Sequence, residues 1–168
     1  MIKDEIEFIL NDKLIKIKDI DTNVTVLNYL RINRKLTGTK EGCASGDCGA
    51  CTAVTAELNN NKLKYKSINT CITFLYNLHG KQLITVENIG KDKIHPVQQA
   101  MIDNDGSQCG FCTPGFVIAM FGMYKNKIKP TNNNIDEYLA GNLCRCTGYK
   151  AIKKAARKMY SYGKKDKF

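Results

Sequence analysis

Apolar and polar side chains largely alternate in the first half of the chain, which predicts strands. The runs EIEFIL (5–10) and KLIKIKDI (13–20) flank Asn11-Asp12, a pair typical of a tight turn, and together they predict a hairpin. Residues 22–36 then switch to helical spacing, with one apolar side formed by Val24, Leu27, Leu30 and Ile32. Further strand-like runs are CTAVTAEL (51–58), LKYKSI (63–68) and QLITVENI (82–89). This order suits a small mixed sheet packed on one helix.

The second half follows the helical period instead. The segments that predict helices are PVQQAMIDND (96–105), TPGFVIAMFGMYKNK (113–127), NNNIDEYLAG (132–141) and TGYKAIKKAARKMYSYG (147–163). Pro96 and Pro114 suit first turns, where the N–H that proline lacks would have no partner, and Gly141 suits a helix end. The change of pattern near 90–94 predicts an α+β protein of two domains. The first, 1–91, is β-rich, and the second, 92–168, is all-helical.

The formal net charge of +10 is unevenly distributed. Residues 150–168 contain eight basic and one acidic side chain, a net of +7, whereas the remaining 149 residues contain 18 basic and 15 acidic ones, a net of +3. The excess therefore belongs to a basic last helix and tail, and not to a stripe interleaved with stacking aromatic residues. We expect a solvated helix face and no nucleic acid, with docking to an acidic partner surface as an open alternative.

Eight cysteines are the unusual feature of the composition. A small secreted protein would use them as four disulfides, but the N-terminus MIKDEIEFIL lacks the long apolar run of a signal peptide. No stretch approaches the roughly 20 apolar residues of a membrane span. We therefore expect a cytoplasmic protein with reduced thiols in metal sites and no membrane association. His79 and His95 are expected to be structural, and no constellation of catalytic acids and bases is found.

The first cysteine set, Cys43, Cys48, Cys51 and Cys71, has the spacing C-x4-C-x2-C followed by a fourth cysteine after 19 residues. This is the plant-type 2Fe–2S pattern, in which one loop supplies three ligands. The glycines of EGCASGDCGAC allow the backbone to approach a cluster closely and to turn N–H groups toward sulfur. Structural zinc sites usually present two short cysteine pairs instead. The spacing favours iron and sulfide over zinc.

The second cysteine set, Cys109, Cys112, Cys144 and Cys146, is spaced C-x2-C-x31-C-x1-C. Taken alone, this spacing leaves a 2Fe–2S cluster, a zinc site and a thiol–disulfide pair open. Both halves of the set precede expected helix starts, at Thr113 and Thr147. Helix N-termini stabilise thiolates and anionic clusters, so two of them facing each other would suit a negatively charged cofactor.

Several segments resemble one known family, the iron–sulfur subunit or domain of the molybdenum hydroxylases. They are LTGTKEGCASGDCGACTA, INTCITFLYNLHGKQLITVE, HPVQQAM, GSQCGFCTPGF and GNLCRCTGY, which together span most of residues 4–160. Within that family they look most like the xanthine dehydrogenase branch. The resemblance implies a plant-ferredoxin-like β-grasp domain followed by a four-helix 2Fe–2S domain.

The resemblance also implies roles for individual residues. The first cysteine set would bind the outer 2Fe–2S cluster, nearer FAD, and the second set would bind the inner one, nearer molybdenum. Gln108 would hydrogen-bond the pterin of the molybdenum cofactor, with Cys146 close to that pterin. A structural role for Gln108, in which its amide satisfies backbone groups at a helix entry, is the alternative.

The function implied is electron transfer within a xanthine dehydrogenase-like oxidoreductase of purine catabolism. Single electrons would pass from the molybdopterin centre through two 2Fe–2S clusters to FAD. The partners would be a molybdopterin-binding large subunit and an FAD-binding subunit or domain, assembled as a dimer of heteromers, and no substrate site is expected in this chain. The alternatives are the same role in an aldehyde, carbon monoxide or N-heterocycle dehydrogenase, and a zinc-stabilised nucleic-acid-binding module.

Overall fold

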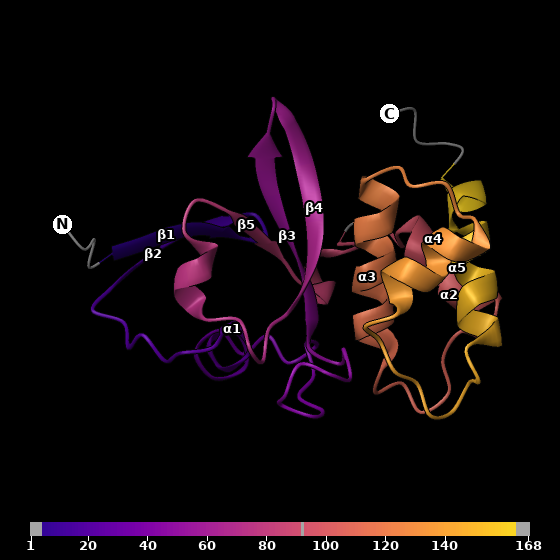
Figure 1. Cartoon of the computed structure of the whole chain (residues 1–168), viewed down its shortest axis with the longest axis horizontal. Helices are drawn as coiled ribbons and strands as arrows, with labels where there is room; N and C mark the ends of the chain where they lie inside the picture. The colour runs from indigo at the N-terminus through magenta and orange to yellow at the C-terminus, as the bar shows by residue number, and fades with distance from the viewer. Residues whose placement is uncertain (1–4, 92, 164–168) are drawn as a thin grey trace.

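The computed structural model describes residues 5–91 and 93–163, and its first element is the expected hairpin (Figure 1). Strands β1 (Glu5–Leu10) and β2 (Lys13–Lys18) pair antiparallel around Asn11-Asp12. Asn11 has a φ of +57°, a left-handed conformation that asparagine tolerates in tight turns. The second strand ends two residues earlier than the pattern 13–20 predicts.

The hairpin belongs to a five-stranded sheet in the order β2-β1-β5-β3-β4. The other strands are β3 (Thr52–Asn59), β4 (Lys62–Asn69) and β5 (Gln82–Ile84). Strands β1 and β5 are parallel, and the remaining neighbours are antiparallel. The prediction of a strand over 82–89 was wrong beyond Ile84, because Val86–Asn88 forms a short 3-10 turn. A second 3-10 turn covers Leu75–Leu78.

The segment 22–36 is not the single regular helix that its spacing predicts. Its helical pieces are α1 (Val26–Asn28) and a π-helical turn (Tyr29–Asn33). The hydroxyl of Thr25 caps α1 and fixes its start. Leu27 and Leu30 are buried as expected, but Ile32 is 61% exposed. The placement of Ile32 on the apolar side was wrong, because residues two apart, such as Leu30 and Ile32, do not share a face of a helix.

The second half contains the four expected helices, which Figure 1 shows beside the sheet. They are α2 (Pro96–Asp103), α3 (Thr113–Lys125), α4 (Asn132–Leu139) and α5 (Lys150–Tyr162). Nearly every residue of α3 is buried, because the helix lies between β3 and β4 on one side and the other three helices on the other. Pro96 and Pro114 stand in first turns as predicted. Helix α4 ends before Gly141.

Two apolar cores hold this arrangement together. One lies between the first hairpin, α1 and the Leu75–Leu78 turn and includes Phe8 and Leu30. The other joins strand β3 to the helices, and it includes Val54 and both Met120 and Met123 of α3. The α+β class is confirmed, and the division at residue 91 stays a prediction, because the second core draws on the sheet as well as on the helices.

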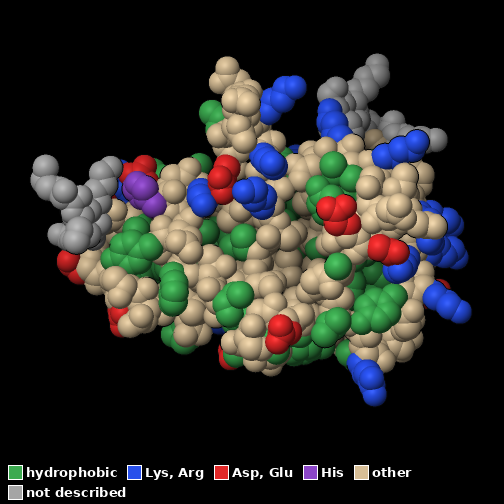
Figure 2. All heavy atoms as spheres, viewed as in Figure 1, with side chains coloured by type: hydrophobic (Ala, Val, Ile, Leu, Met, Phe, Trp, Pro, Cys, Tyr) green, Lys and Arg blue, Asp and Glu red, His purple; other side chains and the backbone are tan. Residues whose placement is uncertain are grey.

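The basic residues of the last helix are arranged as a solvated face. Lys150, Lys154, Arg157 and Lys158 are exposed, while Ile152, Ala155, Ala156 and Met159 face the core. Figure 2 shows Lys and Arg side chains gathered at the α5 end of the molecule. Residues 164–168 of the basic tail lie outside the described residues. Within 5–91 and 93–163, no helix has both the length and the apolar content needed to cross a membrane.

Candidate metal centres

The loop before β3 carries the first three cysteines and directs backbone N–H groups at sulfur. The Sγ atom of Cys43 accepts hydrogen bonds from the amides of Ser45 (3.4 Å), Asp47 (3.3 Å) and Cys48 (3.4 Å). The amide of Cys43 in turn donates to the Sγ atom of Cys48 at 3.3 Å. Hydrogen bonds from Ser45, and then from Cys48, lower the pKa of the Cys43 thiol to about 5. This loop therefore favours thiolate at Cys43, the form that binds metal.

Glycine permits this tight winding. Gly46 has a φ of +85°, and Gly49 has a φ of +70°, both in the region that side chains disfavour. Gly42 is needed for space instead, because a Cβ atom there would lie 2.7 Å from the Sγ atom of Cys48. The expected positive φ is confirmed at Gly46 and Gly49, and close approach to a cluster stays a prediction.

The fourth cysteine of the first set, Cys71, lies in the turn just after the end of β4. The Sγ atoms of Cys51 and Cys71 lie 3.3 Å apart, and the Thr70 hydroxyl bonds the carbonyl oxygen of Cys51 at 2.7 Å. Burial, and then the neighbouring Cys51, raise the pKa of the Cys71 thiol to about 11. The pairing of β3 with β4 thus brings together two cysteines that are 20 residues apart.

The second set is assembled from two turns of the helical half. Cys109 and Cys112 precede α3, and Cys112 is its N-cap residue. The Sγ atoms of Cys109 and Cys146 lie 3.6 Å apart. Cys144 and Cys146 lie in the connection from α4 to α5. The expected helix start at Thr147 was wrong: α5 begins at Lys150, because the preceding Gly148 and Tyr149 adopt left-handed conformations.

Cys112 and Cys144 form the inner pair of this set. Burial, and then the neighbouring Cys144, raise the pKa of the Cys112 thiol to about 12. Burial also raises the pKa of the Cys144 thiol, but hydrogen bonds from Thr147 and the Cys146 amide outweigh it and lower that pKa to about 7. The Thr147 hydroxyl lies 3.2 Å from the Sγ atom of Cys144. The Cys144 amide donates to the Tyr149 hydroxyl at 3.1 Å.

The sulfur atoms therefore gather in pairs. A tetrahedral metal with metal–sulfur bonds of about 2.3 Å holds its sulfur ligands about 3.8 Å apart, close to the 3.3 Å and 3.6 Å observed. Among residues 5–91 and 93–163, no three His, Cys, Asp or Glu side chains surround a single-ion position. Two pairs for each set fit a cofactor with two irons, each taking two thiolates.

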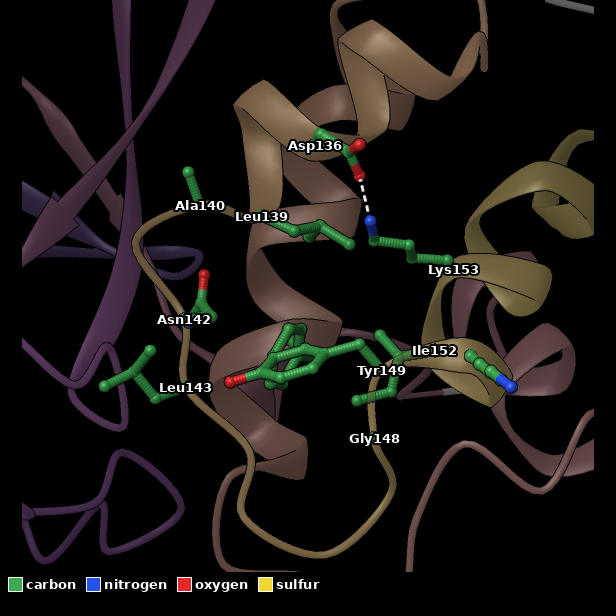
Figure 3. Close-up of a pocket in the computed structure, with 11 residues that line it drawn as sticks. Asp136, Leu139, Ala140, Asn142, Leu143, Gly148, Tyr149, Ile152 and Lys153 are labelled. Atoms are coloured by element: carbon green, nitrogen blue, oxygen red, sulfur yellow. Dashed lines mark ion pairs between the residues drawn. The ribbon is translucent and has the colours of Figure 1, made fainter.

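A hollow of about 400 Å³ lies beside the second set, between α4, the following loop and the start of α5 (Figure 3). Asn142 and Leu143 line one side, Tyr149 and Ile152 line the other, and the ion pair of Asp136 with Lys153 (2.5 Å) closes one end. None of its described lining residues is a cysteine. The hollow is therefore separate from the thiol pairs.

Known proteins match this chain closely. A family model of a [2Fe-2S] binding domain matches residues 85–157. The xanthine dehydrogenase of Emericella nidulans is 47% identical over 161 residues, which are 94% of this chain and 12% of that protein. The solved aldehyde oxidoreductase of Desulfovibrio desulfuricans ATCC 27774 has a TM-score of 0.82 and 30% identity, over 94% of this chain and 17% of that one. The quinoline 2-oxidoreductase structure from Pseudomonas putida 86 has a TM-score of 0.77 and 27% identity, over 94% of this chain and 96% of that one.

The chain belongs to the molybdenum hydroxylase family, as an iron–sulfur part of it. The relatives named above are oxidoreductases by name. This iron–sulfur part spans about an eighth of the length of the curated xanthine dehydrogenase, 12%. The residues that match the [2Fe-2S] binding-domain model include all four cysteines of the second set. The spacing of these cysteines alone left a 2Fe–2S cluster, a zinc site and a thiol–disulfide pair open.

The remaining candidate residues have clear positions. Gln108 is exposed beside Cys109, and among the described residues no hydrogen bond from its side chain is found. His79 accepts the Glu7 amide at 3.1 Å, and His95 caps α2 by accepting the Val97 amide at 3.2 Å, so both histidines have the structural roles that were expected. Sequence reasoning missed Asn142, Thr147 and Tyr149. All three lie in or beside the motif GNLCRCTGY, whose cysteines alone drew attention.

Proposed function

We propose that this chain is the electron-transfer component of a xanthine dehydrogenase-like molybdenum hydroxylase, with one 2Fe–2S cluster on each cysteine set. The observation that carries the proposal is the grouping of eight thiols into two sets of two pairs. A bound 2Fe–2S cluster accepts or donates one electron at a time. The protein's part is to supply thiolates, to direct N–H groups at sulfur and to shield the buried sulfur atoms from water.

The pairs assign the ligands of each iron. In the first set Cys43 and Cys48, which exchange hydrogen bonds, would share one iron, and Cys51 and Cys71 would share the other. In the second set Cys109 and Cys146 form the surface pair. Cys112 and Cys144 would hold the inner iron of that set.

The surface pair of the second set points to the molybdenum partner. Cys109 and Cys146 are both exposed, and the exposed amide of Gln108 stands next to them. An amide offers both donors and acceptors, which suits the edge of a pterin. The structural role considered for Gln108, bonding backbone groups, receives no support from a side chain that points to solvent. Molybdopterin would be held by a large partner subunit against this face, and FAD by a further subunit or domain nearer the first set.

The finer fold assignment follows the same proposal. Parallel β1 and β5 in the middle of the order β2-β1-β5-β3-β4 support a plant-ferredoxin-like β-grasp domain over 1–91. The packing of α2–α5 supports a four-helix 2Fe–2S domain over 92–168. Assembly as a cytoplasmic dimer of heteromers that acts in purine catabolism completes the proposal.

The test is the metal content of the protein purified under argon. We expect a red-brown protein with about four irons and four acid-labile sulfides, and two distinct low-temperature EPR signals after dithionite reduction. Cys112→Ala should remove one signal and Cys71→Ala the other. A colourless protein that contains zinc and no sulfide would overturn the proposal and favour the zinc-stabilised module. Loss of both signals in each variant would show that the sites are not independent.

A test of Gln108 separates its two possible roles. We expect Gln108→Ala to keep both EPR signals and the melting temperature while weakening association with the molybdopterin-binding partner. Gln99→Ala is a control, since the side-chain amide of this half-buried helix residue donates to Asp103 on its own helix. A fall in melting temperature with unchanged association would assign Gln108 a structural role instead.

The aldehyde and N-heterocycle enzymes are a second candidate for the holoenzyme. The structural similarity to an aldehyde oxidoreductase and to quinoline 2-oxidoreductase favours this candidate as well. The thiols, hydrogen bonds and exposed pair described above would serve either enzyme. Assays of the reconstituted complex with a purine, an aldehyde and a quinoline separate the two candidates, because substrate selection belongs to the partner that binds molybdopterin.

A further inference from the structure

The two cysteine sets are joined by a direct backbone hydrogen bond. The amide of Leu143 donates to the carbonyl oxygen of Cys48 at 2.9 Å. Cys48 belongs to the first set, and Leu143 is covalently bonded to Cys144 of the second. A continuous bonded route therefore runs from the Sγ atom of Cys48 along its own backbone, across one hydrogen bond, and along the backbone to the Sγ atom of Cys144.

Asn142 braces this contact from the neighbouring position. Its side chain is 5% exposed, and its Nδ2 atom donates to the carbonyl oxygen of Gly49 (2.9 Å) and to the hydroxyl of Thr52 (3.1 Å). The Thr52 hydroxyl itself donates to the same Gly49 carbonyl at 2.7 Å. The backbone N–H of Asn142 donates to the carbonyl oxygen of Leu139 at the end of α4. One buried side chain thus ties the end of α4 to the loop of the first set.

The backbones at this contact have no room for side chains. A Cβ atom on Gly49 would lie 2.2 Å from the carbonyl oxygen of Gly141, and one on Gly115 would lie 2.4 Å from the carbonyl oxygen of Gly49. Both clashes are with backbone atoms, which cannot move aside as a flexible side chain would. We call the contact formed by Gly49, Thr52, Gly115, Asn142 and Leu143 the seam.

We propose that Asn142 is a positioning residue that holds the two cysteine loops in register across the seam and so sets the coupling between the two sites. The proposal rests on the proposed function, since coupling requires a cluster at each set. Loss of the side-chain amide would leave the buried Gly49 carbonyl with fewer donors and would loosen the Leu143–Cys48 hydrogen bond beside it. The thiols themselves are untouched by Asn142, so both sites should still fill.

The experiment compares the full-length wild-type protein with Asn142→Ala and with a matched control. Asn104→Ala is that control: Asn104 is also 5% exposed, and its Nδ2 atom donates to a backbone carbonyl, but the acceptor is Ala100 in its own helix. Two quantities are measured. One is the spin–spin splitting between the two reduced centres by EPR, and the other is hydrogen exchange, by mass spectrometry, of the peptide containing Leu143.

We expect Asn142→Ala to keep about four irons and both EPR signals but to show a reduced splitting between them. Amide hydrogen exchange at Leu143 should become about ten-fold faster, because the stabilisation from roughly one hydrogen bond is lost. Asn104→Ala should show wild-type splitting and exchange. Wild-type splitting in Asn142→Ala would overturn the inference. So would an equal loss of splitting in both variants, since any buried asparagine would then have the same effect.

A second pair of variants serves if Asn142→Ala does not fold. Thr52→Val removes the hydroxyl partner of Asn142 with little change in volume, and Thr52→Ser restores it. We expect reduced splitting in the first and recovery in the second, and no difference between them would overturn the inference. A wild-type protein without iron and sulfide would instead contradict the proposed function. The exchange comparison remains informative in that case, because it does not depend on iron.

Discussion

Gly115 has only a hydrogen atom where other residues have a Cβ atom, and the seam leaves no room for a larger group. We expect Gly115→Ala to lower the free energy of unfolding by about 1–3 kcal/mol, since overpacking against a backbone carbonyl outweighs the better helix propensity of alanine. Urea denaturation of the full chain measures this change. Gly141→Ala is the control, because a Cβ atom there meets nothing within 4 Å, and it should change stability by less than about 1 kcal/mol. Equal destabilisation by both would contradict the prediction.

Thr147 contacts a cysteine of the second set through its hydroxyl, so we expect it to influence that site without binding metal. Its hydroxyl donates to the Sγ atom of Cys144, and such donors stabilise the more negative, reduced form of a cluster. We expect Thr147→Val to lower the reduction potential of one centre by roughly 20–60 mV, the one-electron equivalent of a hydrogen bond of about 0.5–1.5 kcal/mol.

A redox titration followed by EPR measures the shift at Thr147. Thr147→Ser should restore the wild-type potential. Thr113→Val is a further control, because the Thr113 hydroxyl bonds Ser107 and not a sulfur atom. A shift of both signals together would contradict a local effect.

At the residue scale, the sequence points to the candidate ligands more readily than to the residues that support them. The eight cysteines are recognisable because metal ligation requires one side-chain type at fixed spacing. Asn142 carries no such signal, since its partner Gly49 lies 93 residues away and only the packing of the two halves brings them together. Thr147 directly follows Cys146, but its role depends on a turn that the helical pattern had concealed.

At the scale of elements, the predictions from sequence fail where a local turn interrupts a periodic pattern. The hairpin and the helices α2 and α3 were predictable because their turns and proline starts agree with their periods. The start of α5 was not, because the apolar spacing continues back through Thr147 while Gly148 and Tyr149 turn left-handed. That displacement matters chemically, since it releases Thr147 from a helix and lets its hydroxyl reach sulfur.

Tyr160 joins α5 to the end of α3. Its hydroxyl has two carbonyl oxygens within hydrogen-bond distance as acceptors, those of Ile128 (2.7 Å) and Met123 (3.1 Å), and its ring stacks on Tyr124 at 4.9 Å. We expect Tyr160→Phe to keep the stacking and to lower the free energy of unfolding by about 1–2 kcal/mol. Urea denaturation at neutral pH measures this change, and an unchanged stability would contradict it.

The same residue predicts a pH dependence. Burial, and then the neighbours Tyr124 and Tyr138, raise the pKa of Tyr160 to about 12, whereas an unfolded tyrosine titrates near about 10. Between these values the unfolded chain releases a proton that the folded chain retains, so stability falls as the pH rises. The fall should be shallower in Tyr160→Phe. Parallel curves for the two proteins would show that Tyr160 does not contribute.

At the scale of the whole molecule, we expect bound iron and sulfide to hold in place a long segment that has no secondary structure. Residues 34–51 contain no helix or strand, yet they include three of the cysteines that we propose as ligands, Cys43, Cys48 and Cys51. Removal of iron and sulfide should lower the melting temperature by about 10 °C or more, because metal binding acts only on the folded chain. Limited proteolysis should then cut within 34–51 before α3. Cleavage of α3 first, or an unchanged melting temperature, would contradict this prediction.

The seam also limits how such proteins can be recombined. Where two parts of a chain meet through side chains, a changed contact can often be repaired by a substitution on the other side. Gly49 and Gly115 meet through backbone atoms, so neither side has a smaller residue left to offer. A chimera that takes its sheet half from one relative and its helical half from another should therefore assemble only if both parents carry glycine at these positions. The two halves should therefore be exchangeable only as a matched pair.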